Sequence, residues 1–172
     1  MSHVKKNRIG LITFHTSHNL GSLAQTYALQ YVLKVDLCQQ VEVIDFSSIK
    51  QRNMYSLFPK IENWKNIAKN LITLCVYPVL RKRYNDFQEF IDYEFSKTSK
   101  SFGSFEQLKE LNGEFDVLIC GSDQIWNIKC TDFDDAYFLG FDTETKKVAY
   151  AVSLGGQNIT NSPDVQKYQR YL

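Results

Sequence analysis

The sequence has no long apolar run, no excess of charge of either sign and no closely spaced cysteine pair. Its longest apolar stretch, residues 71–80, is ten residues long and contains Pro78, whereas a membrane-spanning helix needs about 20 residues. The net charge is +1, which gives no reason to expect nucleic acid as a partner. The four cysteines lack C-x-x-C spacing and a nearby histidine set, so the common zinc-site patterns are excluded: Cys38, Cys75, Cys120 and Cys130. We therefore expect no transmembrane segment, no nucleic-acid partner and no metal site.

The beginning of the chain does not resemble a secretion signal. Residues 1–8 are basic, but the apolar run that follows, residues 9–14, is too short for a signal-peptide core. Together with the scattered cysteines, of which Cys75 and Cys120 lie in apolar runs typical of buried thiols, this indicates a reducing cytoplasm. Residues 71–80 have two interpretations: a buried helix, which we favour, or a helix that rests on a membrane surface beside the basic triplet at 81–83.

The order of the apolar segments predicts an α/β fold. Four runs rich in strand formers, at 9–14, 41–46, 115–120 and 147–153, have the continuous apolar character of strands in a parallel sheet. Helical patterns occupy 22–34, about 61–77, 79–95 and 104–112, with Pro78 ending or kinking the first of the middle pair. A further helix begins at Ser162. We predict one Rossmann-like domain over residues 1–172, with helices on both faces of the sheet and a helical insertion at about 48–113.

Three polar segments follow strands, where open parallel sheets bind their ligands: residues 15–22, 121–127 and 153–156. The first opens a helix, whose free N–H groups favour an anion, but it contains neither G-x-G-x-x-G nor a P-loop lysine. Asn19 or Ser22 either caps that helix or contacts a ligand. His15 and His18 are either acid–base groups or, as is more usual for loop histidines, structural residues.

The segment after the third strand is the most informative. Within seven residues it carries a carboxylate, Asp123, an amide, Gln124, and an indole, Trp126, a set able to hold sugar hydroxyls and stack on a ring face. Taken singly, Asp123 is typical of a turn and Trp126 of core packing. Taken together, they favour a binding site.

These same residues resemble the polysaccharide pyruvyl transferase family. The resemblance spans residues 9–155, and its most specific part is residues 116–127 (DVLICGSDQIWN). It includes Asn19-x-Gly21 with Gln25 and residues 28–30 (ALQ), then 43–45 (VID), 137–141 (YFLGF) and 149–155 (AYAVSLG), in the expected order. The chain departs from the family pattern at Ala24, where leucine is usual, and at 37–40, where a glycine is usual.

The resemblance implies a fold, a reaction and a division of the site. Family members are similar to two-domain transferases of the GT-B type, so this chain resembles the N-terminal domain, with the C-terminal partner domain absent. The reaction moves a pyruvyl group from phosphoenolpyruvate, a donor substrate and not a cofactor, onto two hydroxyls of a glycan or lipid-linked sugar as a ketal. No arginine lies near the three polar segments in sequence, so we expect the groups that hold the donor to be missing and the chain alone to be an incomplete enzyme.

The residues expected to line the cleft come from the first two polar segments. Asp123 is the predicted catalytic residue, for acid–base work or for orienting a hydroxyl. The predicted substrate-binding residues are Asn19, Gly21, Ser122, Gln124, Trp126 and Asn127. Two other functions stay open: half of a glycosyltransferase that uses a nucleotide-sugar, and a non-catalytic subunit that binds a glycan, a partner domain or a second copy of itself.

Overall fold

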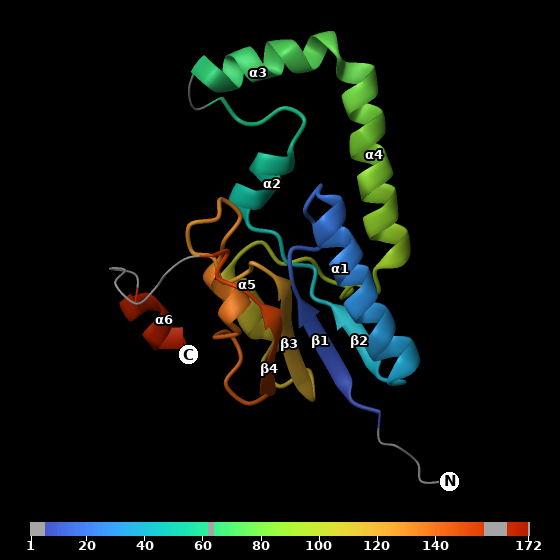
Figure 1. Cartoon of the computed structure of the whole chain (residues 1–172), viewed down its shortest axis with the longest axis vertical. Coiled ribbons are helices and arrows are strands. Elements are labelled where there is room, and N and C mark those ends of the chain that lie inside the picture. Colours follow the sequence, from blue (N-terminus) through green and yellow to red (C-terminus); the bar gives the residue numbers. More distant parts are fainter. Residues whose placement is uncertain (1–5, 62–63, 157–164, 172) are drawn as a thin grey trace.

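The computed structural model describes residues 6–61, 64–156 and 165–171, and its centre is a four-stranded sheet. The strands are β1 (Arg8–Ile12), β2 (Gln40–Val43), β3 (Val117–Asp123) and β4 (Lys146–Val152). They lie in the order β2-β1-β3-β4 and every neighbouring pair is parallel (Figure 1). The predicted parallel sheet is therefore confirmed.

Alternate residues of the buried strands feed two separate cores. Leu11 of β1 packs with Leu23 of helix α1 (Leu20–Tyr31) and Phe87 of helix α4 (Tyr77–Glu94) on one face. Ile12 and Leu118 point to the other face. That face is covered by three short helical segments: α5 (Phe105–Leu108), the 3-10 helix η3 (Asp135–Phe138) and α6 (Val165–Tyr171). Helices cover both faces of the sheet, as the sequence predicts.

The remaining helices connect β2 to β3. They are α2 (Ile49–Tyr55), α3 (Trp64–Cys75) and the 3-10 helix η2 (Lys109–Leu111), together with α4 and α5. α3 and α4 meet where Pro78 was expected to separate two helices, and Pro78 stands in the first turn of α4. α2 was not predicted, although Ser48 and Gln51 form a capping box at its start.

Several expected boundaries differ from the structure, and two of these differences lie at the polar segments. The helix expected at 22–34 begins at Leu20 and gives way to the π-helical segment η1 (Val32–Asp36). The third strand continues through the polar residues to Asp123, which we expected in a loop. Of the helix predicted from Ser162, residues 162–164 lie outside the described part of the chain, and α6 is described from Val165.

The expectation that residues 71–80 form a buried helix is wrong. Leu71, Leu74 and Val79 are 60–72% exposed, and Cys75, expected to be a buried thiol, is exposed too. The local helical pattern was right, but the structure turns its apolar side away from the sheet. Within the described residues, no helix has both the length and the apolar character needed to cross a membrane.

Candidate functional site

The strand order creates a crevice between β1 and β3. The chain leaves β1 through α1 to reach β2 on one side, and then crosses back to β3 on the other side. At such a reversal the segments leaving two adjacent strands separate, and open α/β sheets bind their ligands there. The segment after β1 and the end of β3 thus meet at one point, although about a hundred residues of chain separate them.

A polar cavity of about 380 Å³, which we call the Asp123 cavity, lies at this point. It brings together five of the seven predicted site residues: Asn19, Gly21, Ser122, Asp123 and Gln124. Its other lining residues are Phe14, Ser17, Ser22, Gln25, Tyr55 and Asp132. Of these, Tyr55 and Asp132 carry no signal in the sequence that places them at the sheet edge.

Gln25 ties the start of α1 to the end of β3. Its Oε1 accepts hydrogen bonds from the backbone N and the Oγ of Ser122, at 3.1 and 2.6 Å. Its Nε2 donates to the Oγ1 of Thr13, which in turn donates to the carbonyl oxygen of Ser122. Ser122 is therefore held on three atoms, and Gln25 works as a positioning residue at the cavity wall.

Asp123 is held with one face towards the cavity. Its Oδ2 accepts a 2.8 Å hydrogen bond from the Oγ of Ser22, and its Oδ1 accepts one from the backbone N of Gln124. The residue has a φ of 93°, in the left-handed region that side chains rarely adopt, while its carbonyl oxygen accepts from the backbone N of Ser153. Such a conformation persists only where its surroundings enforce it, and it aims this carboxylate into the crevice.

A second chain of hydrogen bonds forms the opposite wall. The hydroxyl of Tyr55 donates to the Oδ2 of Asp132 and accepts from the Oγ of Ser17, both at 3.0 Å. Burial raises the pKa of Tyr55 to about 12, with a further contribution from Asp132, while the bond from Ser17 acts the other way. Tyr55 thus stays a neutral hydrogen-bonding group at physiological pH.

Two predicted substrate-binding residues lie outside the cavity lining. The indole of Trp126 stacks on Phe138, with centroids 5.3 Å apart, and its Nε1 donates to the carbonyl oxygen of Tyr137. Asn127 is buried, and its amide nitrogen donates to the Oε1 of Gln124 at 3.2 Å. These contacts make Trp126 part of the core packing and let Asn127 orient Gln124. Direct contact of either with a ligand stays a prediction.

Asn19 and Ser22 have different roles: Asn19 caps α1, and Ser22 contacts Asp123. Asn19 is the N-cap of α1, where its Oδ1 accepts from the backbone N of Gly21 at 2.8 Å, and it also lines the cavity. Ser22 does not cap the helix but contacts Asp123. Capping by Asn19 is thus confirmed, and contact of either residue with a ligand stays a prediction.

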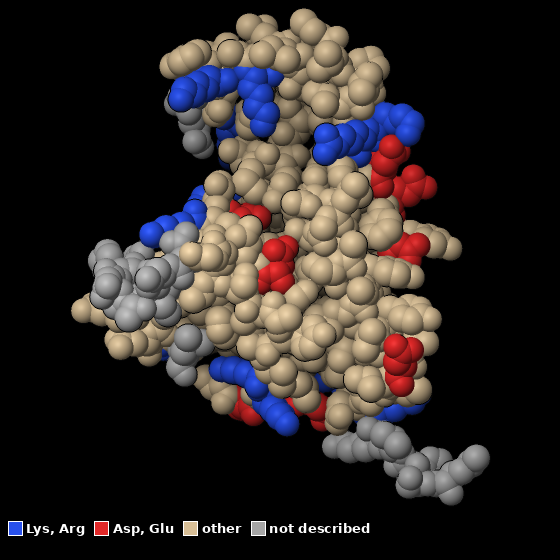
Figure 2. All heavy atoms as spheres, viewed as in Figure 1, with Lys and Arg blue, Asp and Glu red and all other residues tan. Residues whose placement is uncertain are grey.

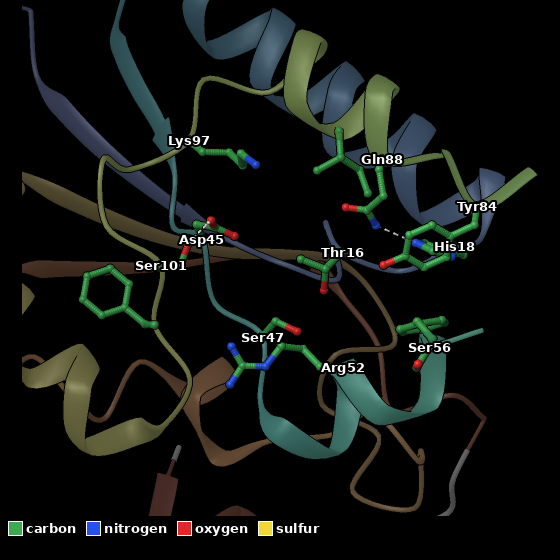
Figure 3. Close-up of a pocket in the computed structure, with 13 residues that line it drawn as sticks. Thr16, His18, Asp45, Ser47, Arg52, Ser56, Tyr84, Gln88, Lys97 and Ser101 are labelled. Carbon is green, nitrogen blue, oxygen red and sulfur yellow. Dashed lines mark hydrogen bonds between the residues drawn. The ribbon is translucent and has the colours of Figure 1, made fainter. Parts of the chain in front are cut away.

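A second cavity, of about 340 Å³, adjoins the first and shares Tyr55 with it (Figure 3). We call it the Arg52 cavity. It contains Arg52, from α2, and Lys97. No arginine lies near the three polar segments in sequence, but the fold brings Arg52 to this edge of the sheet. Lys97 forms an ion pair with Asp92, whereas no ion pair involves Arg52 in the part of the chain described. Sequence reasoning missed Arg52 because it missed α2.

The acidic residue of the Arg52 cavity is Asp45, which anchors a buried histidine. His15 is fully buried, and its Nε2 lies 3.1 Å from the Oδ1 of Asp45. Burial alone would raise the pKa of Asp45, but hydrogen bonds from His15 and Ser101 and the charges of His15 and Lys97 outweigh it and lower that pKa to about 2. Asp45 is therefore ionised under all ordinary conditions, and His15 is a structural partner that lines neither cavity.

His18 also lines the Arg52 cavity, in an aromatic setting. Its ring stacks on Phe87 at 5.1 Å and meets Tyr84 edge-on at 4.7 Å, while its Nε2 faces the Nε2 of Gln88 at 2.8 Å. Because the amide nitrogen of Gln88 donates, this ring nitrogen accepts. Burial, and then the charge of Arg83, lower the pKa of His18. His18 is thus a neutral group at physiological pH, with a ring nitrogen engaged by Gln88.

Among the residues that the structure describes, no three histidine, cysteine or acidic side chains come together in a way that could hold a metal ion. The polar groups of the two cavities are instead hydroxyls, amides, carboxylates, one imidazole, one ammonium and one guanidinium. Hydroxyls, amides and carboxylates are suited to a hydroxylated ligand, and a guanidinium is suited to an anion.

Comparison with known proteins identifies a family. The family model described as "Polysaccharide pyruvyl transferase" matches residues 19–172, a span that starts later than the resemblance noted from sequence and extends further. It contains α1, α2 and most of the lining of the Asp123 cavity, but not Phe14 and Ser17. No curated protein and no solved structure matches the chain.

Proposed function

Because the chain belongs to the polysaccharide pyruvyl transferase family, we propose that it takes part in transferring the pyruvyl group of phosphoenolpyruvate to two hydroxyls of a glycan sugar. The family match carries this proposal. The geometry adds a division of labour between the two cavities, in which the sugar occupies the Asp123 cavity and the anionic donor lies towards Arg52.

The Asp123 cavity suits a neutral acceptor. Asp123 and Asp132 present two carboxylates to it, which attract hydroxyl donors and repel a ligand with a phosphate and a carboxylate of its own. Forming the ketal requires a base for the attacking hydroxyls. Asp123 has the position for that role: Ser22 and the backbone of Gln124 hold its two oxygens, and an acceptor hydroxyl would complete the set.

The Arg52 cavity suits part of the donor. A phosphate or carboxylate is best bound by a guanidinium, which offers two parallel N–H donors. Arg52 has no ion-pair partner in the described residues, and Tyr55 borders both cavities, so a ligand on Arg52 would lie next to the acceptor. Developing positive charge on the pyruvyl carbon would then face the carboxylates of the Asp123 cavity.

The test begins with binding to the chain itself. Calorimetric titration with sugars taken from cell-surface glycans should show saturable binding, and an active form of the protein should release phosphate from phosphoenolpyruvate only when the sugar is present. Sugar binding without phosphate release would favour a glycan-binding subunit. Saturation by a nucleotide-sugar but not by phosphoenolpyruvate would replace the proposal with a glycosyltransferase, the alternative that the sequence left open.

A further inference from the structure

The outer side of α3 is apolar. Five large side chains of this helix are between 46% and 72% exposed: Trp64, Ile67, Leu71, Ile72 and Leu74. Trp64, Ile67, Leu71 and Leu74 follow one another at three- and four-residue intervals, which places them on one stripe of the helix. Val79, in the first turns of α4, continues the apolar surface. We call this set the α3 surface.

The inner side of α3 is polar, which reverses the arrangement of a helix that packs on a core. Thr73 is the buried residue of the helix. The Nδ2 of Asn70 donates to the carbonyl oxygen of Pro59 at 3.3 Å, and the Nδ2 of Asn66 donates to that of Lys60 at 2.6 Å. Polar contacts therefore hold α3 to the rest of the molecule and leave its apolar stripe outside.

Basic residues border the α3 surface. Between residues 60 and 83 the sequence has six cationic residues and one carboxylate, Glu62: the cationic ones are Lys60, Lys65, Lys69, Arg81, Lys82 and Arg83. Figure 2 shows this end of the molecule as a largely uncharged surface edged by lysine and arginine side chains. A chain with a net charge of +1 thus concentrates its positive charge around its most exposed apolar residues.

We propose that the α3 surface binds the face of a lipid bilayer that contains anionic lipids, with α3 lying parallel to that face. An amphipathic helix with aromatic and aliphatic residues on one side and lysines at its borders suits this position. α3 has 12 residues and is about 18 Å long, so it can lie in the headgroup region but cannot span the bilayer. A second copy of the chain would bring two basic borders together, which repel each other.

The orientation that follows brings the cavities near the membrane. Figure 1 shows that α3 lies beyond the carboxyl ends of the strands, at the edge where α1 begins. The same edge carries the Asp123 cavity. A protein attached through the α3 surface therefore turns its carboxyl edge towards the bilayer. If the proposed transfer is correct, this arrangement suits an acceptor sugar carried on a lipid, but membrane binding stands without it.

The experiment measures flotation of the whole chain with vesicles. Vesicles of phosphatidylcholine with about a third phosphatidylglycerol should carry the protein to the top of a density gradient, and pure phosphatidylcholine should carry much less. Salt at 1 M, where the Debye length is about 3 Å, should weaken binding. The emission of Trp64 should shift to shorter wavelength on binding, because that side chain is 72% exposed in the free protein.

Two variants make the test specific. Leu71→Glu with Leu74→Glu should reduce vesicle binding roughly tenfold or more. Each substitution removes an aliphatic side chain that would enter the bilayer and adds a negative charge. The control is Tyr93→Glu, which introduces one of these two negative charges at an 86% exposed residue in the last turn of α4. It should bind nearly as well as wild type. Circular dichroism checks that both variants fold.

Three results would overturn the proposal. The first is no flotation with anionic vesicles, and the second is equal binding by the double variant and the control. The third is concentration-dependent dimerisation that the double variant abolishes while vesicles compete poorly, which would make a second copy the occupant of the α3 surface.

Discussion

The Asp123 cavity and the α3 surface differ in what holds their residues in place. Around Asp123, side chains from α1 and β3 are joined by hydrogen bonds that cross about a hundred residues of sequence. α3 makes few tertiary interactions, and its apolar residues face outward. The first region is determined by the whole fold, whereas the second is a local helix attached to it.

The contrast shows that an apolar pattern can indicate either a buried core or an exposed surface. The apolar runs of β1 and β3 describe a core, because residues on both sides of them become buried. The apolar stripe of α3 has the same local composition but faces out. Substitutions in the two regions should therefore differ in what they damage, the fold in one case and an interaction in the other.

The largest expected effect follows from Gly121→Ala. Gly121 has a φ of +122°, and a Cβ there would lie 2.0 Å from the carbonyl oxygen of Tyr150, inside the β3–β4 pairing. We expect a loss of about 4 kcal/mol or more in the free energy of unfolding, or no folding, as measured by urea denaturation. Gly156→Ala is the matched control, because its φ is +73° but no atom of the described residues lies within 4 Å of a Cβ there, and it should cost only about 1–2 kcal/mol. Similar losses for both variants would contradict this account.

Asp123→Ala should have the next largest effect, on turnover and not on folding. In an active form of the protein, sugar-dependent phosphate release should fall well over tenfold, and by about a hundredfold if Asp123 is the base. Asp123→Asn keeps the shape but not the proton acceptor, so a milder loss would indicate that Asp123 orients the hydroxyl. Asp86→Ala, an exposed residue of α4, is the control. A near-wild-type rate for Asp123→Ala would refute the catalytic role.

Acid should destabilise the fold through Asp45, which lines the Arg52 cavity. Hydrogen bonds from His15 and Ser101 hold the pKa of Asp45 at about 2, against 3.8 for an ordinary aspartate, despite the opposing effect of burial. The folded state thus binds this proton less readily than the unfolded chain, so the stabilisation is complete above about pH 4 and is lost as pH falls towards 2. Unfolding curves at pH 2 to 5 should show a steeper loss for wild type than for Asp45→Asn. Parallel losses would show that other groups dominate.

Leu71→Ala should have the smallest effect on stability. Leu71 is 60% exposed, and alanine favours helix, so the free energy of unfolding should change by no more than about 0.5 kcal/mol. Leu118→Ala leaves a cavity in the fully buried core on the face of the sheet that also holds Ile12. It should cost about 3 kcal/mol in the same urea titration. A large loss at Leu71 would mean that α3 packs against the molecule in solution.

Much of the fold was predictable, because its signals are local. Runs such as residues 117–120 are apolar on both faces, which is typical of a covered parallel strand. Pro78 marked a helix start through its missing N–H. α2 was missed because its seven residues carry little periodicity, and Arg52 was missed with it. Five predicted residues met in one cavity, since each followed or ended a strand at the same edge of the sheet.

The sequence by itself determined the four strands and most of the helices, that the sheet is parallel, and that the polar ends of β1 and β3 adjoin. These follow from the periodicity of apolar residues and from the geometry of parallel strands. Only the tertiary structure decided which way each side chain faces. It turned Trp126 towards Phe138, brought Tyr55 and Asp132 to the cavity wall and left the stripe of α3 outside. Those outcomes depend on which distant segments pack together, which no local pattern of residues specifies.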